Sequence, residues 1–320
     1  MRRLIIALML CLPNLAWTAN TAFPLDDAVP GGVAVVALPA SDHTPHVEFS
    51  GQKVMVVRHE GHWYALVGLS LDTVPGAKML DVDMPGSTDI HAGFTVSPKT
   101  YAEQDLTIAN PEMVNPTPEQ LKRIDREQQH LAKVTGTWVE IHKPGLSFIW
   151  PVKGPETSTF GLKRVLNGEP KSPHSGIDIA APTGTAVDAP ADGLVADVGN
   201  YYYCGKTLTL DMGQGLFSVY CHLSKIKVRR GQRVKQGQLV AKIGATGRTT
   251  GPNLHWTVRL NEVPVDPHVF LGMNVHTPPP ITPPPSATVP AAATIASPAM
   301  VTQPAPKAAS TPAPSAATHK

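Results

Sequence analysis

Between residues 148 and 271 the sequence repeats one pattern, in which short runs rich in β-branched residues end at glycines. β-branched side chains favour strands, and glycines supply the turns that join them. The pattern predicts a mainly β domain with antiparallel, barrel-like sheets over residues 148–273. One hairpin is defined in detail, because a turn at residues 213–215 is expected to join strands at 206–211 and 216–222.

The same hairpin brings two cysteines near each other. Cys204 and Cys221 flank its strands, although not in direct register. Such a pair can hold a disulfide in an oxidising compartment, and two buried thiols that pack as small apolar residues are an equal alternative. Metal ligation by these cysteines is disfavoured, because the chain has no Cys-x-x-Cys pair.

Residues 23–109 alternate turn residues with short apolar runs. The runs cover residues 33–38, 53–57, 63–69 and 92–96. Their spacing predicts a small N-terminal β-sandwich. The histidines of this segment form no ligand motif, so no catalytic role is expected of it. They are His43, His46, His59, His62 and His91.

A helical connector is expected over residues 110–147. Thr117 has the character of an N-cap, Pro118 suits the first helical position, and Gln120 can close a capping box. Gly136 is expected to end the helix. An apolar stripe predicts that the helix over 117–135 packs against its surroundings. The stripe consists of Leu121, Ile124, Leu131 and Val134.

The two ends of the chain differ from its middle. Residues 1–22 join an arginine pair, a short apolar run and small residues, which is typical of a secretory signal peptide. That run is too short to span a bilayer, and no later stretch approaches the ~18 apolar residues of a membrane helix. We therefore expect a periplasmic or secreted protein of the cell envelope, not a transmembrane one.

Residues 274–320 are rich in Pro, Ala and Thr, with few charges. Such a composition cannot bury a core, so a disordered tail is expected. Charge excludes one class of partner. A formal net charge of +2 and an isoelectric point near 8.4 give no basic stripe of the kind that binds nucleic acid.

One group of residues carries the chemistry. His174 and Asp178 are four residues apart, with Gly176 between them, and His255 follows far along the chain. In an extended strand, His174 and Asp178 would lie on one face, and Gly176 would leave open space there. Two imidazoles and one carboxylate form the open, three-ligand set of a catalytic zinc centre, with water in the fourth position.

Spacing alone is a weak signal, but the surrounding motifs are specific. Residues 174–193, 218–223, 228–244 and 250–256 closely resemble, in this order, the conserved segments of the lysostaphin-type (LytM-like) peptidoglycan endopeptidases. The resemblance spans about residues 148–271. It implies a duplicated hybrid motif, zinc as the cofactor and the peptides of bacterial peptidoglycan as substrate. The region before it also resembles the β-rich N-terminal domain of some proteobacterial members.

Carried over by position, the resemblance implies that His174, Asp178 and His255 bind zinc and that His222 is catalytic. Asn253 stands where the family usually has a histidine. An amide cannot take up a proton, although it can donate a hydrogen bond to an oxyanion. Tyr220 is two residues before His222 and so on the same strand face, but a core role is favoured for it, as it is for Trp256, which is opposite His255.

Two alternatives to an active peptidase follow from the same residues. Residues 228–237 also resemble the hairpins of biotinyl and lipoyl carrier domains, but no lysine is evident at a hairpin tip. The stronger alternative is a catalytically impaired family member that binds the wall or regulates a separate amidase. Such a protein would have partners in cell division or wall remodelling. The retained ligand set and His222 favour the enzyme.

Overall fold

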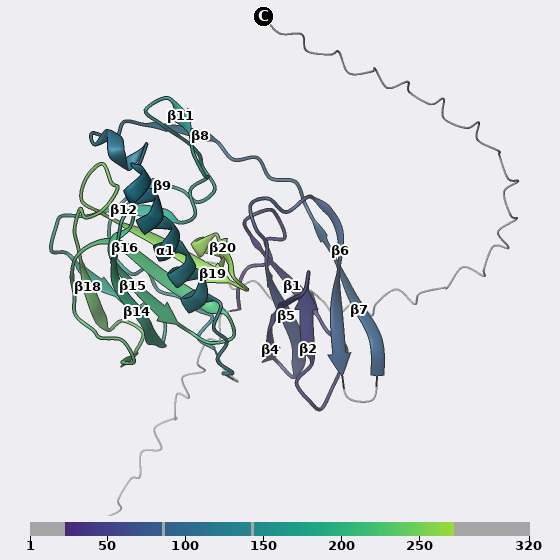
Figure 1. The fold of residues 1–320 in the computed structure, drawn as a ribbon. Coiled ribbons are helices and arrows are strands. Elements are labelled where there is room, and N and C mark those ends of the chain that lie inside the picture. Colours follow the sequence, from purple (N-terminus) through teal and green to yellow (C-terminus); the bar gives the residue numbers. More distant parts are fainter. Residues whose placement is uncertain (1–22, 85–86, 142–143, 272–320) are drawn as a thin grey trace, which may run out of the picture. The chain divides into compact units, whose positions relative to one another are not determined.

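The computed structural model describes residues 23–84, 87–141 and 144–271 of the 320-residue chain (Figure 1). The expected signal peptide and the expected C-terminal tail lie outside these residues. Within the described ranges, no helix combines the length and the apolarity needed to cross a bilayer. The fold is mostly antiparallel β, as the sequence pattern predicts.

The N-terminal segment forms two sheets. The first has the strand order β1-β5-β4 and the second β3-β2-β6-β7. The strands are β1 (Val33–Ala37), β2 (His46–Phe49), β3 (Gln52–Lys53), β4 (Met55–His59), β5 (His62–Gly68), β6 (Gly76–Met84) and β7 (Ser87–Val96). All four apolar runs recognised in the sequence contribute strands.

The sheet β1-β5-β4 is buried on both faces. Ala34 and Val36 point into a core shared with the second sheet, whereas Val33 and Val35 join the core of the C-terminal domain. Successive side chains of a strand point to opposite faces. A strand with two buried faces is therefore apolar throughout, which explains why the run at 33–37 shows no polar alternation.

The α-helix of the described residues lies between the two regions in the sequence. A short 3-10 helix η1 (Pro111–Met113) precedes α1 (Pro118–Thr135), which has the predicted capping box between Thr117 and Gln120 and ends at Gly136. The predicted apolar stripe is only partly confirmed. Ile124 is buried, but Leu121 is 51% exposed.

Polar contacts hold α1 against the C-terminal domain in place of the missing part of the stripe. The backbone N–H of Tyr202 donates to Oε2 of Glu127 (2.7 Å), and Arg123 donates to the carbonyl oxygen of Asn200 (3.0 Å). His130 and Asp197 pair at 3.1 Å. Because these side chains reach the sheet edge, the helix needs little apolar surface there.

The C-terminal domain is built on a large sheet with the order β17-β14-β15-β16-β19-β12-β9, which β13, β18 and β20 extend. Its strands are β9 (Glu156–Ser158), β12 (Ile177–Ala180), β13 (Ala186–Asp188), β14 (Gly193–Tyr201), β15 (Gly205–Asp211), β16 (Leu216–Ile226), β17 (Arg233–Val234), β18 (Leu239–Ile243), β19 (Asn253–Leu260) and β20 (Val263–Val265). A 3-10 helix η2 (Pro267–Phe270) follows. The predicted hairpin is confirmed as β15 and β16, with Leu208 opposite Tyr220.

A small separate sheet stands beside the large one. It has the order β11-β10-β8, and its strands are β8 (Glu103–Leu106), β10 (Lys163–Leu166) and β11 (Glu169–Pro170). β8 and β10 run parallel, with Gln104 opposite Arg164. This sheet joins the segment before α1 to the segment before β12.

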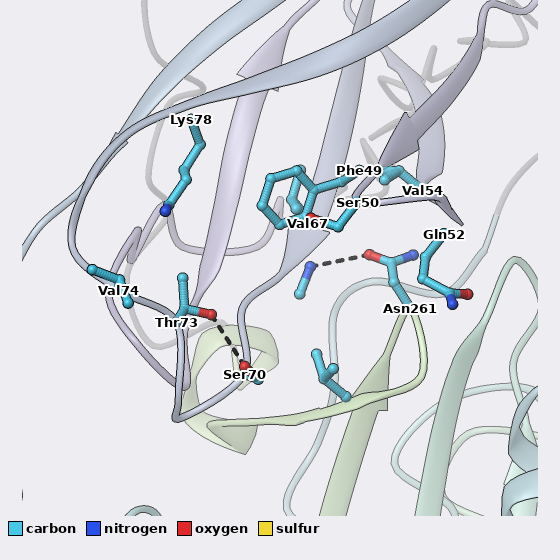
Figure 2. A pocket seen from close by; sticks show the side chains of 12 residues that line it. Phe49, Ser50, Gln52, Val54, Val67, Ser70, Thr73, Val74, Lys78 and Asn261 are labelled. Atoms are coloured by element: carbon cyan, nitrogen blue, oxygen red, sulfur yellow. Dashed lines mark hydrogen bonds between the residues drawn. The ribbon is translucent and has the colours of Figure 1, made fainter. Parts of the chain in front are cut away.

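Two turn residues of the C-terminal domain bind the N-terminal sheet. Oε1 of Gln214 accepts a hydrogen bond from Val56 N–H, and Oδ1 of Asn261 accepts one from Gly68 N–H, both at 3.0 Å. Figure 2 shows Asn261 at the edge of a cavity of about 340 Å³. None of the candidate site residues lines this cavity.

Replacement of Gln214 by alanine should lower the free energy of unfolding by about 1–3 kcal/mol, because the buried Val56 N–H would lose its acceptor. Its side-chain amide also donates to the carbonyl oxygen of Ile141 at 2.7 Å. Urea denaturation measures the change, with Gln128→Ala at an exposed helix position as the control. Equal loss in both variants would contradict this role of Gln214.

Candidate metal and catalytic site

The pairing of β12 with β19 assembles the candidate metal site. Asp178 lies directly opposite His255 in this antiparallel ladder. Directly opposed residues point to the same face of a sheet. The ladder therefore joins a carboxylate to an imidazole that is 77 residues away in sequence.

His174 reaches the same place by a different route from the predicted one. β12 begins at Ile177, so His174 precedes the strand and does not share an extended face with Asp178. The prediction of open space at Gly176 is also wrong. A Cβ there would lie 2.4 Å from the carbonyl oxygen of Trp256, so glycine lets β19 pass close to the chain.

The three side chains converge on one point. Oδ1 of Asp178 lies 3.2 Å from Nε2 of His174 and 2.9 Å from Nδ1 of His255, and the two nitrogens are 2.9 Å apart. All three ligand atoms lie within 4.8 Å of one another. Two nitrogens and one oxygen that meet in this way suit a tetrahedral dication with one position left for a further ligand.

Outer contacts orient both imidazoles for ligation. Nδ1–H of His174 donates to the carbonyl oxygen of Thr159 at 2.7 Å, which leaves the lone pair on Nε2. Nε2 of His255 lies 3.0 Å from Oγ1 of Thr257, and the tautomer that donates there leaves the lone pair on Nδ1. Metal-binding histidines use their second nitrogen in this manner. The site therefore fits a metal ion both in its three ligand atoms and in the hydrogen bonds that orient the two imidazoles.

Burial and charge keep the donors in their ligating forms. Burial alone would raise the pKa of Asp178, but the neighbouring His174 and His255 outweigh it and hold this pKa well below its usual value. Burial lowers the pKa of His174, which is only 2% exposed. A charged carboxylate and a neutral imidazole are the forms that bind a metal ion.

His222 faces the site because of a bulge in β16. Leu208 and Lys206 of β15 pair with Tyr220 and Leu223 of β16, so β16 contains one extra residue between these two pairs. Within this bulge His222 adopts φ 62°. A regular strand would put His222 on the face of Tyr220, which is fully buried in the core beside Trp256. The expectation that Tyr220 and His222 share a face is thus wrong, whereas the core roles of Tyr220 and Trp256 are confirmed.

The imidazole of His222 is arranged as a proton acceptor. Its Nδ1–H donates to the carbonyl oxygen of Thr246 at 2.7 Å, so Nε2 is free to accept. Its ring centroid lies 6.0 Å from that of His255. Burial, followed by the charge of His255, lowers the pKa of His222 to about 4. The ring is therefore neutral at neutral pH.

Asn253 lies beside the ligand cluster. It is two residues before His255 on β19 and pairs with Ala180, so it shares the face of His255. Its Oδ1 accepts a hydrogen bond from Oγ1 of Thr249 at 3.2 Å. The amide NH₂ group remains available as a donor on this face.

Both cysteines of the hairpin are free thiols, and Cys221 is buried.

Sequence reasoning missed some residues that complete the site. Thr257 is the second residue after His255, so strand periodicity could have placed it on the same face. Arg164 donates to Oδ2 of Asp178 at 2.6 Å. No sequence signal links Arg164 to Asp178, because the contact joins β10 of the small sheet to β12 of the large one.

The chain resembles known proteins over both domains. Residues 172–267 match Peptidase family M23, and residues 26–99 match the Peptidase family M23 N-terminal domain. The crystal structure of a putative peptidase M23 from Pseudomonas aeruginosa shares 41% identity and a TM-score of 0.66, and the match covers 77% of this chain and 95% of that one. The chain belongs to peptidase family M23. The resemblance predicted from the motifs is confirmed.

Other relatives of this M23 family member match over shorter segments. Peptidoglycan DD-endopeptidase ShyB of Vibrio cholerae is 45% identical over 94 residues, which are 29% of this chain and 22% of that protein. Cell division protein DipM of Caulobacter vibrioides is 36% identical over 131 residues, or 39% and 21% of the two chains. The chain therefore spans about a fifth of the length of these relatives. The M23 match includes residues 228–237, which identifies them as peptidase rather than carrier domain.

Replacement of Gly176 by alanine should disrupt the metal site of this M23 protein. The new Cβ would collide with the Trp256 carbonyl and force β12 and β19 apart, at a cost of about 1–3 kcal/mol in unfolding free energy. Zinc affinity should fall with it. Gly251→Ala is the matched control, since an added Cβ there meets open space. Titration of zinc against a chelator and urea denaturation measure both effects, and wild-type values for Gly176→Ala would contradict the steric argument.

The folded, chelator-treated protein should lose stability in acid through His222. Its folded pKa of about 4 lies below the ~6.5 of an unfolded histidine, so the unfolded chain takes up a proton first as the pH falls. The contribution is complete above pH ~6.5 and is lost toward pH ~4. We expect the wild type to lose up to about 3 kcal/mol more than His222→Gln over this range.

Urea denaturation at several pH values measures this difference. His43→Gln, a change at an exposed histidine of the N-terminal domain, serves as the control and should follow the wild type. Parallel curves for the wild type and His222→Gln would show that His222 does not titrate in this window.

Proposed function

We propose that the protein is a zinc metallo-endopeptidase that hydrolyses peptide cross-links or stem peptides of bacterial peptidoglycan. One observation carries the proposal. His174, Asp178 and His255 converge within 4.8 Å, and each imidazole is oriented by a hydrogen bond from its other nitrogen. A dication held there would act as a Lewis acid toward a peptide carbonyl and lower the pKa of water.

The chain supplies the proton acceptor. Nε2 of His222 is unprotonated and lies on the side of the ligand cluster, so it can accept a proton from the attacking water. The nearby negative charge of Asp178 favours the imidazolium that results. Since Nδ1 stays bound to the Thr246 carbonyl, the ring keeps its orientation during the transfer. His222 is thus assigned as the general base.

Asn253 supplies a hydrogen-bond donor. Its Oδ1 is engaged by Thr249, which turns the NH₂ group away from that contact. A donor on the face of His255 can stabilise the negative charge that develops on the carbonyl oxygen during attack. Asn253 takes no part in proton transfer, because an amide has no basic lone pair at neutral pH.

The substrate and the location are proposed from the relatives and the N-terminal sequence. ShyB and ShyA of Vibrio cholerae are named peptidoglycan DD-endopeptidases. Residues 1–22 have the pattern of a secretory signal. We therefore propose that the protein acts in the periplasm or outside the cell, on amide bonds such as those between D-alanine and diaminopimelate.

Asn253 also supports a second candidate function. Loss of an acid or base group beside the metal can slow hydrolysis on the order of 100-fold or more. A slow enzyme of this kind could bind the wall or regulate a separate amidase, with partners in cell division or wall remodelling. The relative DipM is named a cell division protein.

Digestion of purified sacculi distinguishes the two candidates. The wild type should release peptide-cleaved fragments, and His174→Ala or chelator treatment should lower release by about 100-fold or more, because the metal site is lost. Asn253→His should raise the rate on the order of 10- to 100-fold, because it adds a proton acceptor. Mass spectrometry of the released fragments identifies the bond that is cut.

Measurement of the zinc content of the purified protein distinguishes the possible outcomes of the digestion. Stoichiometric zinc together with fragment release supports the peptidase. Stoichiometric zinc without release from the wild type, combined with release by Asn253→His, would establish the regulator instead. A wild type that binds no zinc would contradict both proposals.

A further inference from the structure

We propose that Arg164 is a positioning residue that restricts Asp178 to a single-oxygen ligand of the metal ion. The inference rests on the proposed metal site and adds a residue to it. Arg164 lies before the segment that matches family M23, at residues 172–267. Its role comes from contacts with a ligand rather than with the substrate.

The two oxygens of Asp178 have different partners. Oδ1 faces Nε2 of His174 and Nδ1 of His255, so it occupies the ligand position. Oδ2 accepts a hydrogen bond from the guanidinium of Arg164 at 2.6 Å. The side chains of Arg164 and Asp178 are only 18% and 11% exposed. A short ion pair so shielded from water is a strong, directional contact.

This division determines how many positions the carboxylate can fill. A carboxylate that turned both oxygens to the ion would occupy the position that a catalytic site keeps open for water or substrate. To do so here, Oδ2 would have to leave Arg164 and abandon a largely buried cation. With an ion bound, the ion pair would therefore leave one coordination position for water or substrate.

Charge supports a geometric role over a gain in affinity. A guanidinium close to the ligands repels a dication, so Arg164 disfavours metal binding through its charge alone. Its hydrogen bond to Oδ2 instead orients that ligand. Partners outside the ligand set commonly act in this way.

The backbone holds Arg164 and Asp178 in a common frame. Arg164 on β10 is opposite Gln104 on β8. Oε1 of Gln104 accepts a hydrogen bond from Oγ of Ser158 at 2.9 Å, and Ser158 on β9 is opposite Asp178. The positions of the arginine and the carboxylate are therefore coupled through β8, a strand outside both segments matched to the M23 domains.

Cobalt substitution reports the coordination number directly. In the folded protein loaded with Co²⁺, the wild type should show the intense visible absorption of a four-coordinate ion. Arg164→Ala should lose intensity, because Asp178 becomes free to add its second oxygen. Arg164→Lys should lie between the two, since an ammonium keeps the charge but offers no planar fork. Lys163→Ala, the exposed neighbour on β10, is the control and should match the wild type.

Sacculus digestion gives a second measurement. The zinc-loaded Arg164→Ala variant should be about 10- to 100-fold slower than the wild type, while Lys163→Ala should be unchanged. Cobalt spectra of Arg164→Ala and Arg164→Lys that match the wild type would overturn the inference. If Arg164→Ala does not unfold cooperatively, Arg164→Lys alone decides in the same way. No cobalt spectrum from the wild type would instead overturn the metal site itself, and this inference with it.

Discussion

The candidate site depends on the register between β12 and β19. Because Asp178 is paired with His255, the carboxylate and the imidazole emerge on one face, while Trp256 enters the core on the other. A slip by one residue would exchange these faces and bury His255 in place of Trp256. The buried tryptophan therefore specifies the register, and the register assembles the ligands. Gly176 makes the arrangement possible, since it admits the backbone of Trp256.

The site contains several features that lower the stability of a β-sheet. His174 and His222 are almost fully buried, and His222 has a left-handed backbone conformation. Such features destabilise a fold, and they persist where surrounding contacts determine them. Here carbonyl oxygens at Thr159 and Thr246 satisfy the buried imidazoles. The same contacts leave one nitrogen of each ring without a proton, as the proposed function requires.

The N-terminal domain packs against the peptidase domain and forms hydrogen bonds with it. Its first sheet contributes side chains to both hydrophobic cores, and turn residues Gln214 and Asn261 bind its backbone. Further along, β8 pairs with the strand that carries Arg164. The segment before the helix thus reaches an outer contact of the metal site through continuous hydrogen bonding.

The mostly β class, the capped helix, the β15–β16 hairpin and the three candidate ligand residues could all be predicted from the sequence. These depend on local propensity, turn chemistry and ordered motifs, which are legible within short segments. Three features became visible only in three dimensions: His174 precedes its strand, a bulge turns His222 away from Tyr220, and Arg164 binds Asp178. Each of these depends on the close approach of chains distant in sequence. The two-residue alternation of side chains along a strand does not reveal where a bulge interrupts it or which distant segment contacts it.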